Sequence, residues 1–128
     1  MNQSPSVPKI VLLVDDDPDV LKVIKSQLEY EGYAVLMEQT GEAAIEAVRR
    51  VKLMAVLLDL GLVGMGGFEV LNRIKQIKPE VPDMIVTGCH NENEARKSFE
   101  MGAWDYITKP IDFKYLKNVL LIQSQQAS

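Results

Sequence analysis

Polar side chains suited to catalysis or metal binding follow directly after short apolar segments of this 128-residue chain. Three consecutive carboxylates, Asp15 to Asp17, follow the first segment, and another carboxylate, Asp59, follows a later one. Thr87 and Lys109 follow two further apolar segments. A carboxylate, a hydroxyl and an ammonium group are suited to phosphoryl transfer onto an aspartate, provided that the fold brings them to one place.

Carboxylates gathered at one place repel one another and so predict a bound cation. Two carboxylates 4 Å apart repel by about 4 kcal/mol at an effective dielectric near 20. The chain has one cysteine and one histidine, which excludes a zinc site built from Cys and His ligands. A metal must therefore be held by oxygen, which favours Mg²⁺, Ca²⁺ or Mn²⁺. We expect Mg²⁺, with Mn²⁺ as the alternative, because Mg²⁺ keeps positions open for phosphate oxygens.

The apolar segments themselves are typical of strands in a parallel sheet. The run from Ile10 to Val14 is short, continuous and rich in β-branched residues, as expected for a strand buried on both faces. Four more such segments, near residues 33–37, 54–58, 83–86 and 104–108, alternate with segments of helical periodicity. This alternation predicts an α/β fold, a doubly wound parallel sheet with helices on both faces. Ligands of such sheets lie beyond the carboxyl ends of the strands, so the polar residues should converge there.

The composition fits one domain without a global attraction to nucleic acid or membrane. The chain is 47% hydrophobic, and its net charge is −4. No apolar run is long enough to cross a bilayer, and the first nine residues lack the apolar stretch of a signal peptide. Together with the single cysteine, this predicts a cytoplasmic protein. We expect a domain over residues 9–122, a flexible segment 1–8, and a polar tail or linker over residues 123–128.

Four segments, each weak alone, together resemble the receiver domains of two-component response regulators, the CheY-like superfamily, over about residues 9–122. They are VLLVDDDPDV, MAVLLDLGLVGMGG, MIVTGCH and GAWDYITKPID. The resemblance implies the flavodoxin-like receiver fold, with five parallel strands in the order 2-1-3-4-5 flanked by five helices. It implies a phosphoprotein rather than a conventional enzyme, one that catalyses its own aspartyl phosphorylation and dephosphorylation.

The resemblance also implies a role for individual residues in this phosphorylation. Asp59 is the phosphoacceptor, and Thr87 and Lys109 contact the phosphoryl group. Tyr106 is the switch aromatic, which turns inward when Thr87 moves toward that group. The change alters the surface of the fourth helix, fifth strand and last helix. The Lys109–Pro110 peptide bond is expected to be cis.

The implied partners are proteins on either side of this phosphorylation step. The phosphoryl donor is a sensor histidine kinase or a histidine phosphotransfer protein. An output partner, an effector domain or a second copy in a phosphorylation-dependent homodimer reads the altered surface. The domain itself is expected to bind neither nucleic acid nor membrane directly.

The implied metal ligands lie around the acceptor. Asp16, Asp59 and the backbone carbonyl of Gly61 ligate Mg²⁺, and Asp15 contributes through water. The loop after Asp59 departs from the family pattern, because Val63 replaces a common proline and Gly66 replaces a common acidic or amide residue. The loop contains four glycines within seven positions, at 61, 64, 66 and 67, and is costly to order. We therefore expect weaker metal binding than is usual for the family.

Other interpretations of the acidic cluster differ in how well they fit. A phosphate-independent interaction module, or pseudo-receiver, remains an alternative. A haloacid-dehalogenase-type phosphatase would use Asp15 as nucleophile with Asp17 beside it, but would leave Asp59 without a role. A calcium loop starting at Asp15 fails, because Val20 and Ser26 occupy the positions that require glycine and a carboxylate. A flavodoxin fails because the acidic first turn would repel the flavin phosphate.

Overall fold

Five strands and five helices alternate along the computed structural model of this chain, which describes residues 9–126. Each strand begins and ends within one residue of the apolar segment that predicted it. The strands are β1 (Ile10–Val14), β2 (Ala34–Glu38), β3 (Ala55–Asp59), β4 (Asp83–Thr87) and β5 (Asp105–Thr108). The helices are α1 (Pro18–Tyr30), α2 (Gly41–Arg50), α3 (Gly67–Ile77), α4 (Glu92–Glu100) and α5 (Phe113–Gln126).

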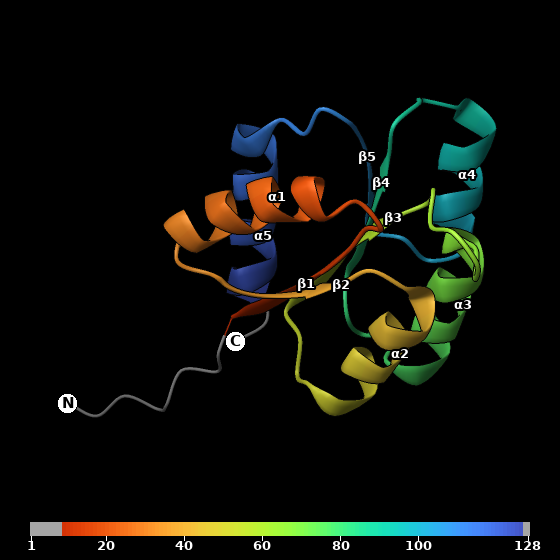
Figure 1. The fold of residues 1–128 in the computed structure, drawn as a ribbon, viewed down its shortest axis with the longest axis horizontal. Coiled ribbons are helices and arrows are strands. Elements are labelled where there is room, and N and C mark those ends of the chain that lie inside the picture. The colour runs from red at the N-terminus through yellow and green to blue at the C-terminus, as the bar shows by residue number, and fades with distance from the viewer. Residues whose placement is uncertain (1–8, 127–128) are drawn as a thin grey trace.

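All five strands are parallel and form one sheet in the order β2-β1-β3-β4-β5, which confirms the expected topology. Helices α1 and α5 cover one face of the sheet, while α2, α3 and α4 cover the other (Figure 1). The strand order reverses between β1 and β3, and in such sheets ligands bind beyond the carboxyl ends of the strands at this point.

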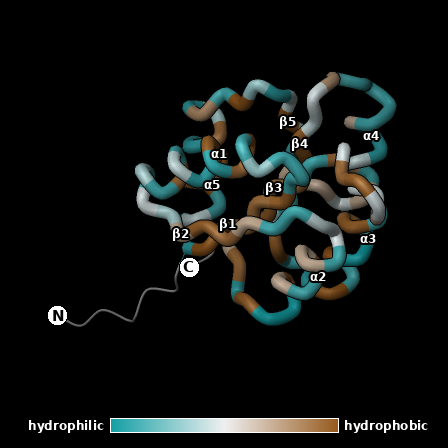
Figure 2. Tube along the Cα trace, viewed as in Figure 1, coloured by the Kyte–Doolittle hydropathy of each residue, from teal (hydrophilic) through white to brown (hydrophobic). Residues whose placement is uncertain are grey.

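The central strands are buried on both faces, which explains their continuous apolar sequence. In β1, Leu12 and Val14 pack toward α2 and α3, whereas Val11 and Leu13 pack toward α1 and α5. Figure 2 shows the apolar strands at the centre and polar segments along the outer helices. Two hydrophobic clusters, one on each face, therefore hold the sheet rigidly and fix where its strands end.

Side chains at the helix termini set where the helices begin. Asp17 accepts a hydrogen bond from the backbone N–H of Asp19 at 2.9 Å, which confirms it as the N-cap of α1. Thr40 caps α2 in the same manner, and Asn91 caps α4. Gly32, with φ of +97°, ends the turn after α1 in the left-handed region that favours glycine.

Helix α5 continues past the domain boundary expected at residue 122. It extends to Gln126, and Gln123 is buried, so this part of the expected polar tail belongs to the domain. Glutamine has a favourable helix propensity, and the helix therefore needs no further apolar residue to continue. The segment 1–8, expected to be flexible, and residues 127–128 lie outside the described residues. Over residues 9–126, no helix has both the length and the apolar character of a membrane span.

Candidate functional site

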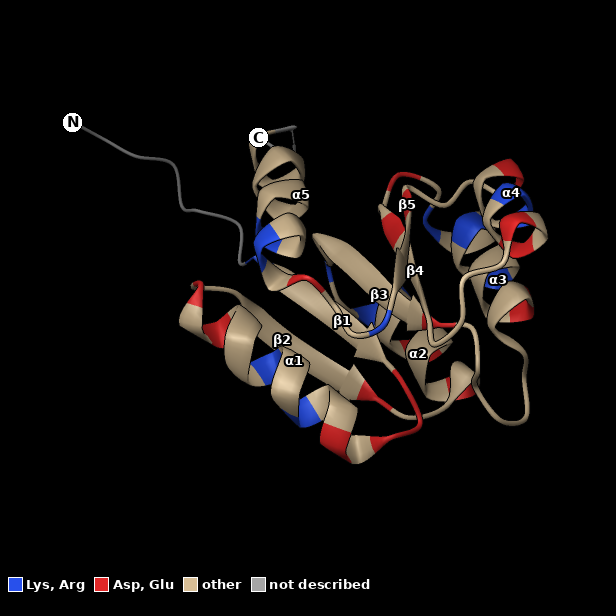
Figure 3. Ribbon diagram, turned by 90° about the horizontal axis from the view of Figure 1, so that it is seen from above, with Lys and Arg blue, Asp and Glu red and all other residues tan. Residues whose placement is uncertain are grey.

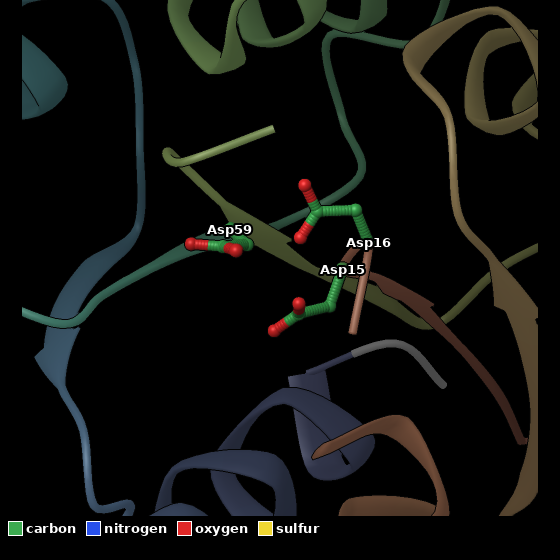
Figure 4. A group of neighbouring side chains, drawn as sticks. All are labelled: Asp15, Asp16 and Asp59. Atoms are coloured by element: carbon green, nitrogen blue, oxygen red, sulfur yellow. The ribbon is translucent and has the colours of Figure 1, made fainter. Parts of the chain in front are cut away.

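Three carboxylates meet at the carboxyl edge of the sheet, as the strand order predicted. Asp15 and Asp16 follow β1, and Asp59 is the last residue of β3 (Figure 4). One carboxylate oxygen of each residue lies within 4.8 Å of the other two. Asp15 and Asp59 are buried, whereas Asp16 is exposed. Figure 3 shows the acidic stretch that joins β1 to α1.

Lys109 extends from the end of β5 back to these carboxylates. Its Nζ atom lies 2.9 Å from Asp15 Oδ2 and 3.6 Å from Asp59 Oδ2. The Lys109 backbone N–H donates to the Thr87 carbonyl, and the Lys109–Pro110 peptide bond is cis, as expected. Burial opposes the lysine charge, but the hydrogen bond to Asp15 and the charge of Asp59 outweigh it and raise the Lys109 pKa. The ammonium group is therefore charged at the site.

The surroundings of the Asp59 carboxylate act on its ionisation in opposite directions. Burial raises the pKa of Asp59, and the charge of Asp15 raises it further. The Gly61 N–H, which donates to Asp59 Oδ1 at 3.0 Å, and the Lys109 ammonium act in the opposite direction. Among the described residues, one cation thus faces three carboxylates, so negative charge remains uncompensated.

The donor atoms at this edge fit a hard divalent cation. Carboxylate oxygens from Asp15, Asp16 and Asp59 are close enough together to share one ion. Over residues 9–126 this is the one group of three His, Cys, Asp or Glu side chains with that geometry. Gly61 lies beside Asp59, because a Cβ atom added at Gly61 would be 3.5 Å from Asp59 Oδ1. Oxygen ligands of this kind suit Mg²⁺ or Mn²⁺ and not a soft metal.

In the glycine-rich loop after Asp59, some positions require glycine for structural reasons and others do not. Gly67 starts α3, and an added Cβ atom would lie 2.6 Å from the Leu60 Cα atom, a distance that side chains do not tolerate. Gly64 has φ of +88°, which other residues rarely adopt. Nothing in the structure requires glycine at position 66, because its backbone is extended and an added Cβ atom would meet nothing within 4 Å. Val63 is largely exposed at the tip of the loop.

Thr87 and Tyr106 reach the loop between β4 and α4. The Thr87 hydroxyl donates to the Cys89 carbonyl at 3.3 Å and accepts from the Cys89 N–H at 3.4 Å. The Tyr106 hydroxyl accepts from the Asn91 N–H at 3.3 Å and lies 3.2 Å from Glu94 Oε1. Sequence reasoning did not find Glu94, which looks like an ordinary acidic residue in a first helical turn.

Comparison with known proteins identifies the class that this fold and site define. The profile described as "Response regulator receiver domain" matches residues 11–121, and the chain belongs to that family, whose members act in two-component systems. The chain is 32% identical over 106 residues to the uncharacterized transcriptional regulatory protein YkoG of Bacillus subtilis, covering 83% of this chain. It spans 46% of the length of that protein.

Solved structures agree with this assignment. A CheY-like receiver domain protein from Methanospirillum hungatei has a TM-score of 0.84 at 29% identity, covering 93% of this chain and 98% of that one. A signal receiver domain from Vibrio parahaemolyticus has a TM-score of 0.87 at 30% identity, covering 94% of this chain and 93% of that one. Family membership disfavours the phosphatase alternative, while a phosphate-independent module stays within the same family.

Proposed function

We propose that this domain accepts a phosphoryl group on Asp59 from a phosphohistidine of a sensor kinase or histidine phosphotransfer protein. The observation that carries the proposal is the convergence of a buried Asp59 with Asp15, Asp16 and Lys109 at one sheet edge. A purely structural role for this cluster is unfavourable, because it leaves uncompensated charge at a partly buried site.

The residues at this edge suit an in-line transfer. An Asp59 oxygen attacks the phosphorus, the phosphorus–nitrogen bond to the donor imidazole breaks, and the ring nitrogen keeps the electron pair. The Gly61 N–H fixes the carboxylate by holding Oδ1, and the Lys109 ammonium 3.6 Å from Oδ2 offsets charge on the phosphoryl oxygens. Mg²⁺, held by Asp16, Asp59 and the Gly61 carbonyl with Asp15 acting through water, would supply further neutralisation of those oxygens.

The signal would leave the site through Thr87 and Tyr106. Phosphorylation replaces a carboxylate with a group that carries about one more negative charge and three acceptor oxygens. We propose that these oxygens draw the Thr87 hydroxyl away from Cys89, and that Tyr106 moves with it. The surface so changed is formed by α4, β5 and α5. Its exposed apolar side chains, suited to a protein partner or a second copy, include Phe99, Trp104 and Tyr115.

An apolar groove beside the acceptor supports a protein as phosphoryl donor. The groove, of about 350 Å³, lies between α1 and the segment that follows β5. Lys109 stands at its wall, so a partner bound there would reach the same edge as Asp59. Its apolar lining is formed by Val20, Val23, Ile24, Pro110, Ile111 and Phe113. A kinase or phosphotransfer protein with an apolar helical surface would match this groove.

The relatives of the domain support a proposal for its output and its cellular setting. YkoG is described as a transcriptional regulatory protein, which supports an effector acting on transcription as the output partner of this chain. We propose that residues 9–126 form the receiver unit and that it works in the cytoplasm, without binding nucleic acid or membrane itself.

Phosphorylation of Asp59 is tested by intact mass after incubation with acetyl phosphate and Mg²⁺. Asp59→Asn removes the acceptor, and Asp19→Asn, at an exposed position in the first turn of α1, is the matched control. We expect one phosphoryl group on the wild type and on Asp19→Asn, and none on Asp59→Asn. An adduct that survives Asp59→Asn and maps to Asp15 would support the phosphatase interpretation. No adduct on the wild type, with no beryllofluoride binding, would indicate a phosphate-independent module.

A further inference from the structure

The loop from residue 88 to residue 91 is held at both ends by the two proposed switch residues. At its start, the Thr87 hydroxyl exchanges two hydrogen bonds with the Cys89 backbone. At its end, the Tyr106 hydroxyl accepts from the Asn91 N–H. We call this the loop-bound arrangement. A threonine hydroxyl has one proton, so it cannot donate to the Cys89 carbonyl and to a phosphoryl oxygen together.

Glu94 makes a third contact in this arrangement, with the hydroxyl of Tyr106. Burial raises the Tyr106 pKa and the Glu94 contact raises it further, while hydrogen bonds with Asn91 and Thr87 act in the opposite direction, so the hydroxyl stays protonated. Its proton has two acceptors within reach, Glu94 Oε1 at 3.2 Å and the Asn91 carbonyl at 3.5 Å, and the carboxylate oxygen is the closer of the two. The Glu94 backbone is fixed on both sides. Its N–H donates to Asn91 Oδ1 at 3.1 Å, and its carbonyl accepts from the buried Ser98 hydroxyl at 2.8 Å. These bonds fix the backbone from which the Glu94 side chain reaches the Tyr106 hydroxyl.

We propose that Glu94 is a positioning residue that stabilises the loop-bound arrangement and so sets how readily Asp59 modification switches the domain. This inference rests on the proposed function, because it assumes that Thr87 turns toward the phosphoryl group. Moving Thr87 releases the start of the loop, whereas the Tyr106 contacts with Asn91 and Glu94 keep its end in place. The Glu94 contact therefore opposes the switch and lowers the apparent affinity for a phosphoryl group.

The contact distinguishes Glu94 from its acidic neighbour. Glu92 lies in the same first turn of α4 and has the same charge near the helix N-terminus, but it is exposed. A general electrostatic effect of the first turn would be shared by both residues. An effect transmitted through Tyr106 belongs to Glu94 alone. Replacing Glu92 is therefore the matched control for replacing Glu94.

The test measures the apparent affinity for beryllofluoride, a phosphoryl analogue, in the presence of Mg²⁺. The thermal midpoint, followed as the beryllofluoride concentration is raised, gives the binding curve. Losing one hydrogen bond made only in the loop-bound arrangement should tighten the apparent affinity about fivefold in Glu94→Ala. Glu94→Gln keeps an acceptor oxygen and should stay near the wild type, as should Glu92→Ala.

A double-mutant cycle shows whether the effect is transmitted through the hydroxyl. In a Tyr106→Phe background, Glu94→Ala should change the affinity no further. Glu94→Met keeps a long helix-forming side chain without an acceptor and replaces Glu94→Ala should the latter fail to fold. If the wild type binds no beryllofluoride, the proposed function itself fails. If the wild type binds, then an unchanged or weaker affinity in Glu94→Ala, or an effect that persists in Tyr106→Phe, overturns the role of Glu94.

Discussion

A buried ion pair at the end of the sheet opposite to Asp59 allows a stability experiment with a defined outcome. Asp83, the first residue of β4, is fully buried, and its Oδ2 atom lies 2.9 Å from Lys75 Nζ on α3. Lys75 also donates to the Val81 carbonyl at 2.8 Å. Burial nevertheless raises the Asp83 pKa to about 6, because desolvation outweighs the attraction of the lysine. Asp83 Oδ1 has no hydrogen-bond partner among the described residues, which adds to the cost.

The magnitude follows from this shift. A rise from 3.8 to about 6 means that keeping Asp83 ionised in the folded chain costs roughly 3 kcal/mol at neutral pH. The folded state binds the proton more tightly than the unfolded state. The stability contributed by this group therefore falls as pH rises from about 4 to about 6, and then levels off. Replacing Lys75 by Met removes the cation and leaves Asp83 to protonate, and because pH 7 lies about one unit above the Asp83 pKa, the loss should be about 1–2 kcal/mol. The loss should be smaller at pH 5, because Asp83 is then mostly protonated whether or not Lys75 is present.

Urea unfolding, followed by circular dichroism at pH 5 and pH 7, measures both values. Lys22→Met, on the exposed side of α1, is the matched control and should change the stability little. The double variant Lys75→Met/Asp83→Val should recover the wild-type stability or exceed it, since an apolar pair can replace a buried ion pair. A loss in Lys75→Met that is equal at the two pH values would refute the reasoning. So would a double variant as unstable as Lys75→Met.

Three further predictions concern the carboxyl edge. Lys109→Gln should slow phosphorylation of Asp59 by acetyl phosphate about a hundredfold, and an unchanged intact-mass time course would contradict the role of the ammonium. Gly67→Ala should lower the free energy of unfolding by about 1–3 kcal/mol, because the added Cβ atom would clash with Leu60. Gly66→Ala is the control, because its Cβ atom would meet nothing within 4 Å and should not lower that free energy through a clash. Gly66→Asn should raise that free energy by up to about 1 kcal/mol by capping α3 and should tighten Mg²⁺ binding by restricting the loop. Calorimetry that shows unchanged Mg²⁺ affinity would contradict the link between loop freedom and metal binding.

The sequence was sufficient to predict which residues meet at the carboxyl edge, because the alternation of strands and helices predicts a parallel sheet. Each strand is short and buried on both faces, so its end could be located within one residue, and parallel strands carry their ends to one edge. The contact of Glu94 with Tyr106 was not predictable in the same way, because it depends on how α4 is rotated against β5. The Lys75–Asp83 pair likewise depends on the docking of α3. The extent of α5 was underestimated, since polar residues such as Gln123 ended the apolar pattern without ending the helix.

The charge balance at the carboxyl edge connects the site to the switch. Asp15, Asp16 and Asp59 carry three negative charges and Lys109 one positive charge, which leaves two negative charges for a divalent cation to balance. Phosphorylation would add about one negative charge to a site whose charges the divalent cation has balanced. We infer that the excess is met by a neutral hydrogen-bond donor at the same edge, and Thr87 ends the neighbouring strand β4. Because its single proton is already given to the loop, the phosphoryl group can gain this donor only by changing the loop.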